Sequence, residues 1–239
     1  MLRLFQFEPK YGLPNVSPFC MKVETFLRMA KIQYAMQIVK NPRTTPKGKA
    51  PYINDDGTVV ADSAFIVDYL TEKYHVTLDR DLTGLQRGIA TMTTGALEER
   101  LYFVLVYSRW VEAKNWEQIK QLWFSGLPPV VRSVVPGIVR KGVIKTLNLQ
   151  GIGRHSRDEI YALGIKDLKG LVQVLGDQKY LLGAEPTSVD AVVFAFVANI
   201  LKVPLSSPLF DYVADQHELV SYCQRMGKKY FPEYAVFQS

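Results

Sequence analysis

The sequence is poor in the residues that build disulfide frameworks and metal centres. It has only two cysteines, Cys20 and Cys223, far apart in the chain, and three histidines. Two distant cysteines form no disulfide framework and show no spacing typical of a metal site. We therefore expect a protein of a reducing compartment that binds no metal.

Long hydrophobic runs are also missing. The apolar run at residues 2–7 is too short for a signal peptide. The longest apolar stretch, residues 191–201, is interrupted by Asn199 and is too short to span a bilayer. It predicts a core helix instead, and we expect a cytoplasmic protein.

Carboxylates are scarce in one segment. The chain carries a net charge of +6, and residues 126–157 contain no Asp or Glu. A solvated helix face is the simplest interpretation, and contact with an anionic partner or membrane surface is the alternative. Basic and aromatic residues are not interleaved as in nucleic-acid modules, so we expect no nucleic-acid partner. The basic residues of this segment are Arg132, Arg140, Lys141, Lys145, Arg154 and Arg157.

The first part of the chain alternates strand and helix patterns. An Asp-Gly pair at 56–57 predicts a tight hairpin turn, because such turns require positive φ. Asp62 and Ser63 are preferred helix caps before an apolar-periodic stretch. We predict strands at 2–7, 35–39, 50–53 and 58–61, helices at 17–30 and from 63, and one irregular turn within 41–48.

Strand patterns almost disappear beyond residue 76. Residues 75–82 are predicted to be a linker, followed only by helices. The sequence therefore predicts an α/β domain at 1–76 and an all-α domain at 83–239. The expected helices are 82–112, 116–124, 130–147 with a break near Pro136, 157–175, 187–201, and further helices within 209–230.

Ser17 is the first candidate functional residue. It is a preferred N-cap, and Pro18 suits the first helical position. A helix N-terminus carries positive potential and unpaired N–H groups, so a hydroxyl there is well placed to hold an anionic sulfur. The alternative is a simple cap that contributes about 1 kcal/mol of stability.

Two further stretches have the same double interpretation. A cis bond at Ala50-Pro51 would turn the Ala50 N–H and C=O outward to pair with an extended peptide, although only about 5% of such bonds are cis. Ser63 would bind a carboxylate at a helix N-terminus, and Asp62 would hold an ammonium group. Alternatively, the proline only opens a strand and the pair only caps a helix.

The order of these motifs resembles the glutathione S-transferase family. The motifs are Ser-Pro-Phe-Cys at 17–20, Gly-Lys-Ala-Pro-Tyr-Ile at 48–53 and Asp-Ser-Ala-Phe-Ile-Val-Asp-Tyr-Leu at 62–70. The resemblance implies a thioredoxin-like, glutathione-binding domain at 1–76. Residues 186–191, Pro-Thr-Ser-Val-Asp-Ala, resemble the structural capping box of the family's helical domain.

A narrower resemblance covers other parts of the chain. Residues 17–30, 107–111, 150–156 and 222–226 are similar to the failed-axon-connections and cadmium-responsive subgroup, which is related to metaxins. That subgroup includes members with scaffold, transport-related or unclear roles. The resemblance therefore implies two alternatives: a transferase, or a non-catalytic module that associates with a protein or a membrane surface.

The family resemblance also implies roles for individual residues. Ser17 would stabilise the thiolate of glutathione for attack on a small hydrophobic electrophile, with Tyr11 as the runner-up. The thiol pKa of about 8.5 would fall when a hydroxyl donates to the thiolate. Ala50 and Pro51 would bind the tripeptide backbone, Asp62 and Ser63 its γ-glutamyl end, and Lys49 its glycyl carboxylate. Homodimers are usual in the family.

Several other residues allow more than one interpretation. Cys20 stands alone at a thioredoxin-type spacing from Ser17, which excludes a dithiol cycle; it is a packed apolar residue or, alternatively, forms a mixed disulfide with glutathione. Arg154, His155 and Ser156 either contribute to the electrophile pocket or are structural. Tyr107, Arg109 and Trp110 either face the cleft or pack between helices.

Overall fold

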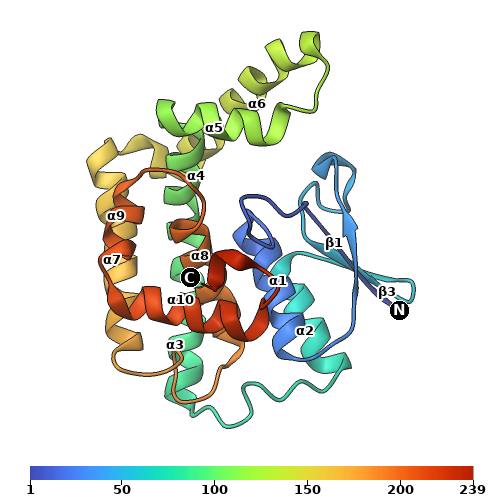
Figure 1. The fold of residues 1–239 in the computed structure, drawn as a ribbon, viewed down its shortest axis with the longest axis vertical. Coiled ribbons are helices and arrows are strands. Elements are labelled where there is room, and N and C mark those ends of the chain that lie inside the picture. Colours follow the sequence, from blue (N-terminus) through green and yellow to red (C-terminus); the bar gives the residue numbers. More distant parts are fainter. Residues whose placement is uncertain (239) are drawn as a thin grey trace.

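The computed structural model describes residues 1–238 and divides them into a mixed α/β part and a helical part (Figure 1). This arrangement confirms the predicted fold class. Ser239, the last residue of the predicted helical domain, lies outside the described residues. In Figure 1 the sheet lies on one side of α1 and α2, and the helical part lies on the other.

The N-terminal part is a four-stranded mixed sheet with the strand order β2-β1-β3-β4. β1 pairs with β2 in parallel and with β3 antiparallel, and β3 pairs antiparallel with β4. The alternation of β1 places Leu2 and Leu4 in the core. The elements are β1 (Leu2–Gln6), α1 (Pro18–Met29), β2 (Ala35–Ile38), β3 (Tyr52–Asp55), β4 (Thr58–Ala61) and α2 (Ser63–Lys73), with one irregular turn at Pro42–Thr44.

The predicted helix at 82–112 has a π-helical interruption. α3 and α4 are joined through the π-helical segment Ala96–Leu101, which adds a residue per turn and places Leu97 and Leu101 in the core. The remaining elements are α3 (Gly84–Gly95), α4 (Tyr102–Trp110), α5 (Ala113–Phe124), α6 (Pro129–Gln150), α7 (Arg157–Leu175), α8 (Ser188–Leu201), α9 (Pro208–Ala214) and α10 (His217–Tyr230), with short turns at Ile152–Arg154 and Ala235–Phe237.

The predicted helix break near Pro136 is wrong, because α6 continues through this proline. A proline inside a helix removes one backbone hydrogen bond and costs about 3 kcal/mol. Pro136 is buried on the side of α6 that faces the body of the protein, so its ring contributes to packing. α6 also contacts α4 and α5.

α8 occupies the centre of the molecule and packs against α1, α3, α9 and α10. Its capping box forms as predicted: the Asp190 carboxylate accepts from the Thr187 N–H at 2.8 Å and from the Thr187 hydroxyl at 3.1 Å. It also accepts from the Leu181 N–H and the Tyr222 hydroxyl, both at 2.9 Å. Within residues 1–238, no helix is both long and apolar enough to cross a membrane.

Candidate functional site

The register of the sheet brings the three predicted stretches to one end of the N-terminal part. Phe5 of β1 is opposite Tyr52 of β3, and Tyr52 is opposite Ala61 of β4. The loop that leads to Ser17 therefore leaves the sheet beside the Ala50-Pro51 bond, and Asp62 follows Ala61 directly. Ser17 and Asp62, which are 45 residues apart in the sequence, therefore lie at the same sheet end, because one antiparallel strand begins where its neighbour ends.

Ser17 caps α1 as predicted. Its backbone is extended, with φ −95° and ψ 119°, and its Oγ accepts from the Cys20 N–H at 3.4 Å. Ser17 is half-buried. Asn15 fixes the approach to this cap: its Oδ1 accepts from the Ser17 N–H at 3.0 Å, and its Nδ2 donates to the Phe7 carbonyl at 2.7 Å.

A buried arginine lies beneath the loop that carries Ser17. The Arg109 guanidinium of α4 donates to the Val16 carbonyl at 2.6 Å and to the Asn199 carbonyl and Oδ1 at 3.1 and 3.0 Å. Asn199 of α8 donates in turn to the Asn15 carbonyl at 3.2 Å. Burial lowers the pKa of Arg109 to about 10, which leaves the group charged at neutral pH.

The Arg109 network ties both parts of the protein to the Ser17 loop. Its partners in the described residues are amide groups rather than carboxylates, so its positive charge is not cancelled beside the positive end of α1. The sequence leaves Arg109 between packing and the cleft, and it indicates neither Asn199 as the partner of Arg109 nor Asn15 as the acceptor for Asn199. Asn199 interrupts the apolar run at residues 191–201, and this interruption was the sequence signal that could have pointed to a buried polar network.

The Ala50-Pro51 bond is cis and directly precedes β3. Pro51 is buried and Ala50 is half-buried. The Lys49 carbonyl accepts from the Thr45 hydroxyl at 2.7 Å, which fixes the backbone before the cis bond. The Lys49 side chain is exposed, and it makes no hydrogen bond or ion pair with the described residues.

Asp62 and Ser63 begin α2 in different environments. Asp62 is exposed, has φ +89°, and accepts from the Ala64 N–H at 3.0 Å as the helix cap. Ser63 is buried, and its Oγ accepts from the Lys22 Nζ at 3.4 Å. Lys22 is itself buried on α1 and pairs with Glu98 of the π-helical segment at 2.7 Å.

The Lys22–Glu98 ion pair joins the two parts of the protein next to Ser63. Neither residue was predicted from the sequence, because a lysine on a helix surface ordinarily reaches solvent and only the tertiary packing covers this one. The π-helical segment places Glu98 toward α1, and such segments are frequent at functional sites. The pair therefore adds one cation and one anion to this end of the sheet.

Tyr11 lies at the tip of a turn from Lys10 to Leu13. Tyr11 and Gly12 both have positive φ, and the Leu13 N–H donates to the Lys10 carbonyl at 2.9 Å. The Tyr11 side chain is 37% exposed and lies close enough to Arg109 to favour its charged form. Both hydroxyls that sequence analysis considered are thus near the N-terminus of α1, Ser17 on the helix and Tyr11 on the loop before it.

Cys20 is completely buried on α1. Burial raises the pKa of its thiol to about 12, so the thiol is protonated at neutral pH and is a poor nucleophile. The structure favours the packed apolar residue over a mixed disulfide. Next to it, Phe19 contacts the ring of Tyr102 with 4.7 Å between centroids, which gives the Ser17 region an aromatic side.

The other candidates serve mainly as structural residues. Ser156 caps α7 in a capping box with Glu159, and His155 is exposed beside them. Tyr107 contacts Tyr161 and Trp110 contacts Trp116 between helices. A shallow polar pocket lies between α5, α7 and α9, where Glu112 and Arg157 are paired, and none of the residues at the sheet end lines it.

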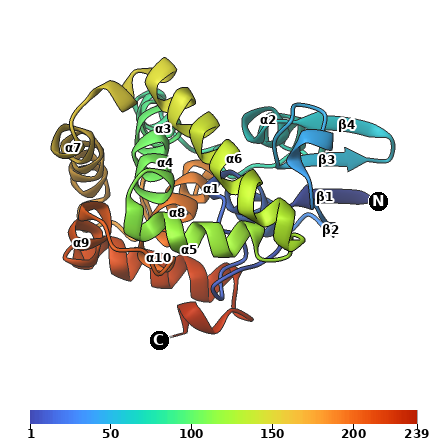
Figure 2. The ribbon, with the colours of Figure 1, turned by 90° about the horizontal axis from the view of Figure 1, so that it is seen from above.

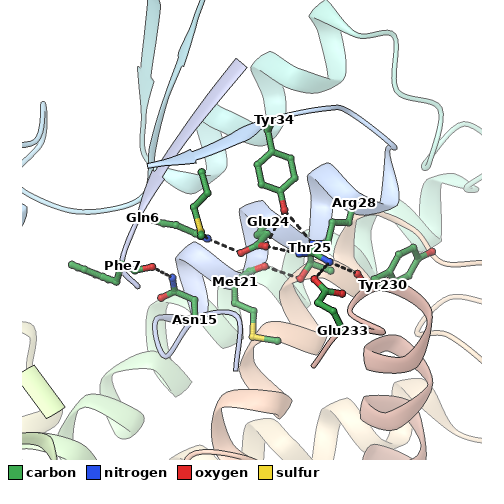
Figure 3. A network of polar contacts seen from close by, with 11 residues as sticks. Gln6, Phe7, Asn15, Met21, Glu24, Thr25, Arg28, Tyr34, Tyr230 and Glu233 are labelled. Atoms are coloured by element: carbon green, nitrogen blue, oxygen red, sulfur yellow. Dashed lines mark hydrogen bonds and ion pairs between the residues drawn. The ribbon is translucent and has the colours of Figure 1, made fainter. Parts of the chain in front are cut away.

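A buried network fixes the opposite face of α1 (Figure 3). The Glu24 carboxylate accepts from the Gln6 Nε2 at 2.6 Å and from the Tyr34 hydroxyl and the Arg28 guanidinium at 2.9 Å each. Arg28 also donates to the Tyr230 carbonyl at 2.9 Å. The network joins β1, α1 and the C-terminal segment, so α1 is held on both faces and its N-terminus has a defined position.

The described residues match two family models. Residues 18–115 match the glutathione S-transferase N-terminal domain, and residues 164–226 match the glutathione S-transferase C-terminal domain. The solved structures with this fold include glutathione transferase F7 from Populus trichocarpa, with a TM-score of 0.63 and 15% identity over the full length of both chains. Human glutathione S-transferase T1-1 in its apo form has a TM-score of 0.60 and 15% identity, over 100% of this chain and 87% of that one.

Three relatives by sequence cover almost all of this chain. Failed axon connections of Drosophila melanogaster is 32% identical over 98% of this chain, which spans only 59% of that protein. Isoprene-epoxide–glutathione S-transferase of Rhodococcus sp. (strain AD45) is 30% identical over 96% of this chain and 99% of its own length. Metaxin-1 of Mus musculus is 30% identical over 97% of this chain and 75% of its own length. With the fold and both family models in agreement, the chain belongs to the glutathione S-transferase family.

Proposed function

We propose that this protein binds glutathione at the N-terminus of α1 and activates its thiol for attack on a small hydrophobic electrophile. The observation that carries the proposal is the sheet register, which gathers the Ser17 cap, the cis Ala50-Pro51 bond and the Asp62–Ser63 pair at one sheet end. A tripeptide needs groups for its backbone, its termini and its thiol. In this proposal Ser17 serves the thiol, the Ala50-Pro51 stretch serves the backbone, and the Asp62–Ser63 pair serves the γ-glutamyl end.

Ser17 is the proposed thiolate-stabilising residue. Its hydroxyl would donate to the sulfur, which would also lie in the positive potential of the α1 N-terminus. The buried Arg109 behind the Val16 carbonyl adds a positive charge on the same side. All of these favour the thiolate over the thiol, which lowers the thiol pKa.

The other groups at this end of the sheet would hold the peptide. The Ala50 backbone next to Pro51 would pair with the cysteinyl residue of glutathione as an added strand. Ser63 and Asp62 would bind the γ-glutamyl carboxylate and ammonium groups, and Lys49 would bind the glycyl carboxylate. The electrophile would lie beside Phe19 and Tyr102, and the isoprene-epoxide relative suggests that epoxides should be the first class tested.

Calorimetry and turnover test this proposal together. We expect glutathione to bind to the wild-type protein, and Ser17→Ala to reduce turnover of an epoxide by roughly 10²–10³-fold, as for loss of one hydrogen bond to a developing anion. Tyr11→Phe is the matched control and should leave turnover nearly unchanged. Absence of glutathione binding, or a larger loss in Tyr11→Phe than in Ser17→Ala, would contradict the assignment.

A second candidate function is association without catalysis. The observation that favours it is that Glu98 already neutralises the charge of Lys22, the cation that lies next to Ser63. Two of the relatives, Failed axon connections and metaxin-1, are not named as enzymes. This candidate predicts that neither the wild-type protein nor Glu98→Gln, which frees Lys22, binds glutathione in calorimetry. Binding by either protein would count against it.

A further inference from the structure

α6 exposes a continuous stripe of side chains along its outer face. Val130, Val134 and Ile138 are 80%, 56% and 59% exposed, and they are spaced four residues apart, which places them on one side of the helix. The stripe continues through Lys141 and Lys145 to Leu149, which is 71% exposed. We call these six residues the α6 ridge.

Among the described residues, the ridge side chains are exposed because α6 packs mainly through its opposite side. Its buried residues are Pro136 and Leu147, and its neighbours are α4, α5 and the turn Ile152–Arg154. Figure 1 shows α5 and the first turns of α6 extending beyond the rest of the molecule, and Figure 2 shows α6 along the outside of the helical part. A flat surface could therefore approach the ridge without touching the sheet.

The charged side chains of the segment that carries the ridge all have one sign. Residues 126–157 contain no carboxylate, and the side chains of Arg132, Lys141 and Lys145 make no ion pair in the described residues. Arg140, by contrast, faces inward and donates to the carbonyls of Trp110 and Val111. The lysines of the ridge are thus available to an anionic partner.

We propose that the α6 ridge docks this protein onto the surface of an anionic lipid membrane. A helix that presents apolar side chains and lysines on one face binds at the boundary between headgroups and acyl chains. Val130, Val134 and Ile138 enter that boundary, and Lys141 and Lys145 contact acidic headgroups. A nucleic acid would not cover the exposed valines, and an apolar protein surface would not match the lysines. The docking is independent of the Ser17 site.

Vesicle co-sedimentation of the protein of 239 residues tests the proposal. We expect binding to vesicles of phosphatidylserine and phosphatidylcholine at low salt, weaker binding at high salt, and none to phosphatidylcholine alone. Lys141→Gln with Lys145→Gln should lower the partition coefficient by about 25-fold, or roughly fivefold for each basic residue near an anionic surface. Val134→Asp with Ile138→Asp should abolish binding.

Matched control variants distinguish binding through the α6 ridge from binding through the overall positive charge of the protein. Lys166→Gln with Lys169→Gln removes the same charge from exposed positions on α7 and should change binding less than twofold. Circular dichroism should show that all variants are folded, since the altered side chains are exposed. No binding by the wild-type protein, or equal losses in the α6 and α7 lysine variants, would overturn the proposal.

Sedimentation velocity tests the alternative that a second copy of the chain covers the ridge. The proposal predicts that Val134→Asp with Ile138→Asp leaves the oligomeric state unchanged. A wild-type dimer that this variant converts to a monomer would overturn the membrane assignment. Ser17→Ala should bind vesicles like the wild-type protein, so failure of the glutathione site and failure of the ridge give different results.

Discussion

α6 and α8 are both rich in valine, isoleucine and leucine, yet their environments are opposite. All residues of α8 from Val189 to Ile200 are buried, whereas the buried residues of α6 are Pro136 and Leu147. α8 contacts α1, α3, α9 and α10, whereas α6 contacts mainly α4, α5 and the turn Ile152–Arg154. Apolar composition alone therefore does not predict whether a helix is buried. The elements that surround the helix determine how much of its apolar surface is covered.

The largest effect should come from truncating α8. Phe194 is completely buried and contacts Phe231 and Phe237. Phe194→Ala should lower the free energy of unfolding by about 3–5 kcal/mol, because it loses buried apolar area and leaves a cavity. Urea denaturation measures the change. A loss below about 1 kcal/mol would mean that α8 is not the centre of the core.

Removal of the buried charge next to α8 should also destabilise the protein, by less than the truncation of Phe194. Arg109→Leu leaves the Val16 carbonyl and the Asn199 Oδ1 without their donor, which should cost about 1–3 kcal/mol in urea denaturation. The matched control is Arg154→Leu, an exposed arginine that donates to the Asn148 carbonyl, with an expected change below about 0.5 kcal/mol. Equal losses in the two variants would show that burial of Arg109 does not matter.

The two buried thiols should make the free energy of unfolding fall as the pH becomes alkaline. Burial raises the pKa of Cys20 and of Cys223 from 9.0 to about 12. The folded protein then keeps these protons up to a higher pH than the unfolded chain, so their contribution is complete below pH 9 and is lost as the pH rises toward 12. Each cysteine should cost about 1.4 kcal/mol per pH unit between those values.

A double variant isolates this contribution. Cys20→Ala with Cys223→Ala should lose less stability between pH 8 and pH 10 than the wild-type protein, by about 2–3 kcal/mol for both thiols together. Urea midpoints at the two pH values give the comparison. If both proteins lose the same amount, the thiols ionise as easily in the folded state as in the unfolded chain.

The smallest effect should come from the exposed helix. Ile138→Ala on α6 should change the free energy of unfolding by less than about 0.5 kcal/mol, because this side chain is already in water. The same urea experiment measures it. A loss above about 1.5 kcal/mol would mean that another molecule covers the α6 ridge in solution, and the comparison with α8 would fail.

Local sequence patterns were sufficient for most of the fold. Caps, alternation and the Asp-Gly turn predicted the order of strands and helices in the N-terminal part, because each signal acts on neighbouring residues. The expected break at Pro136 was wrong, since burial of the proline ring offsets one missing hydrogen bond. Periodicity also predicted one helix at 82–112 without its π-helical segment, because that segment depends on tertiary packing.

The residues of the candidate site also fall into two groups, those that local motifs predicted and those that no local motif indicated. Ser17, Pro51 and the Asp62–Ser63 pair were found because each belongs to a local motif. The groups that support them were missed because they act over long distances: Arg109 reaches the Val16 carbonyl, 93 residues away, and Lys22 pairs with Glu98, 76 residues away. These pairs form because α1 packs against the helical part. No sequence pattern around either member of a pair indicates the other.

The central claim is that the α1 N-terminus favours the thiolate of bound glutathione. The direct measurement is a pH titration of the thiolate absorbance of bound glutathione in the wild-type protein, Ser17→Ala and Tyr11→Phe. We predict a thiol pKa clearly below about 8.5 in the wild-type protein and in Tyr11→Phe, and a pKa about 1–2 units higher in Ser17→Ala. A bound thiol that titrates like a free thiol in the wild-type protein, or a shift that survives in Ser17→Ala, would contradict it.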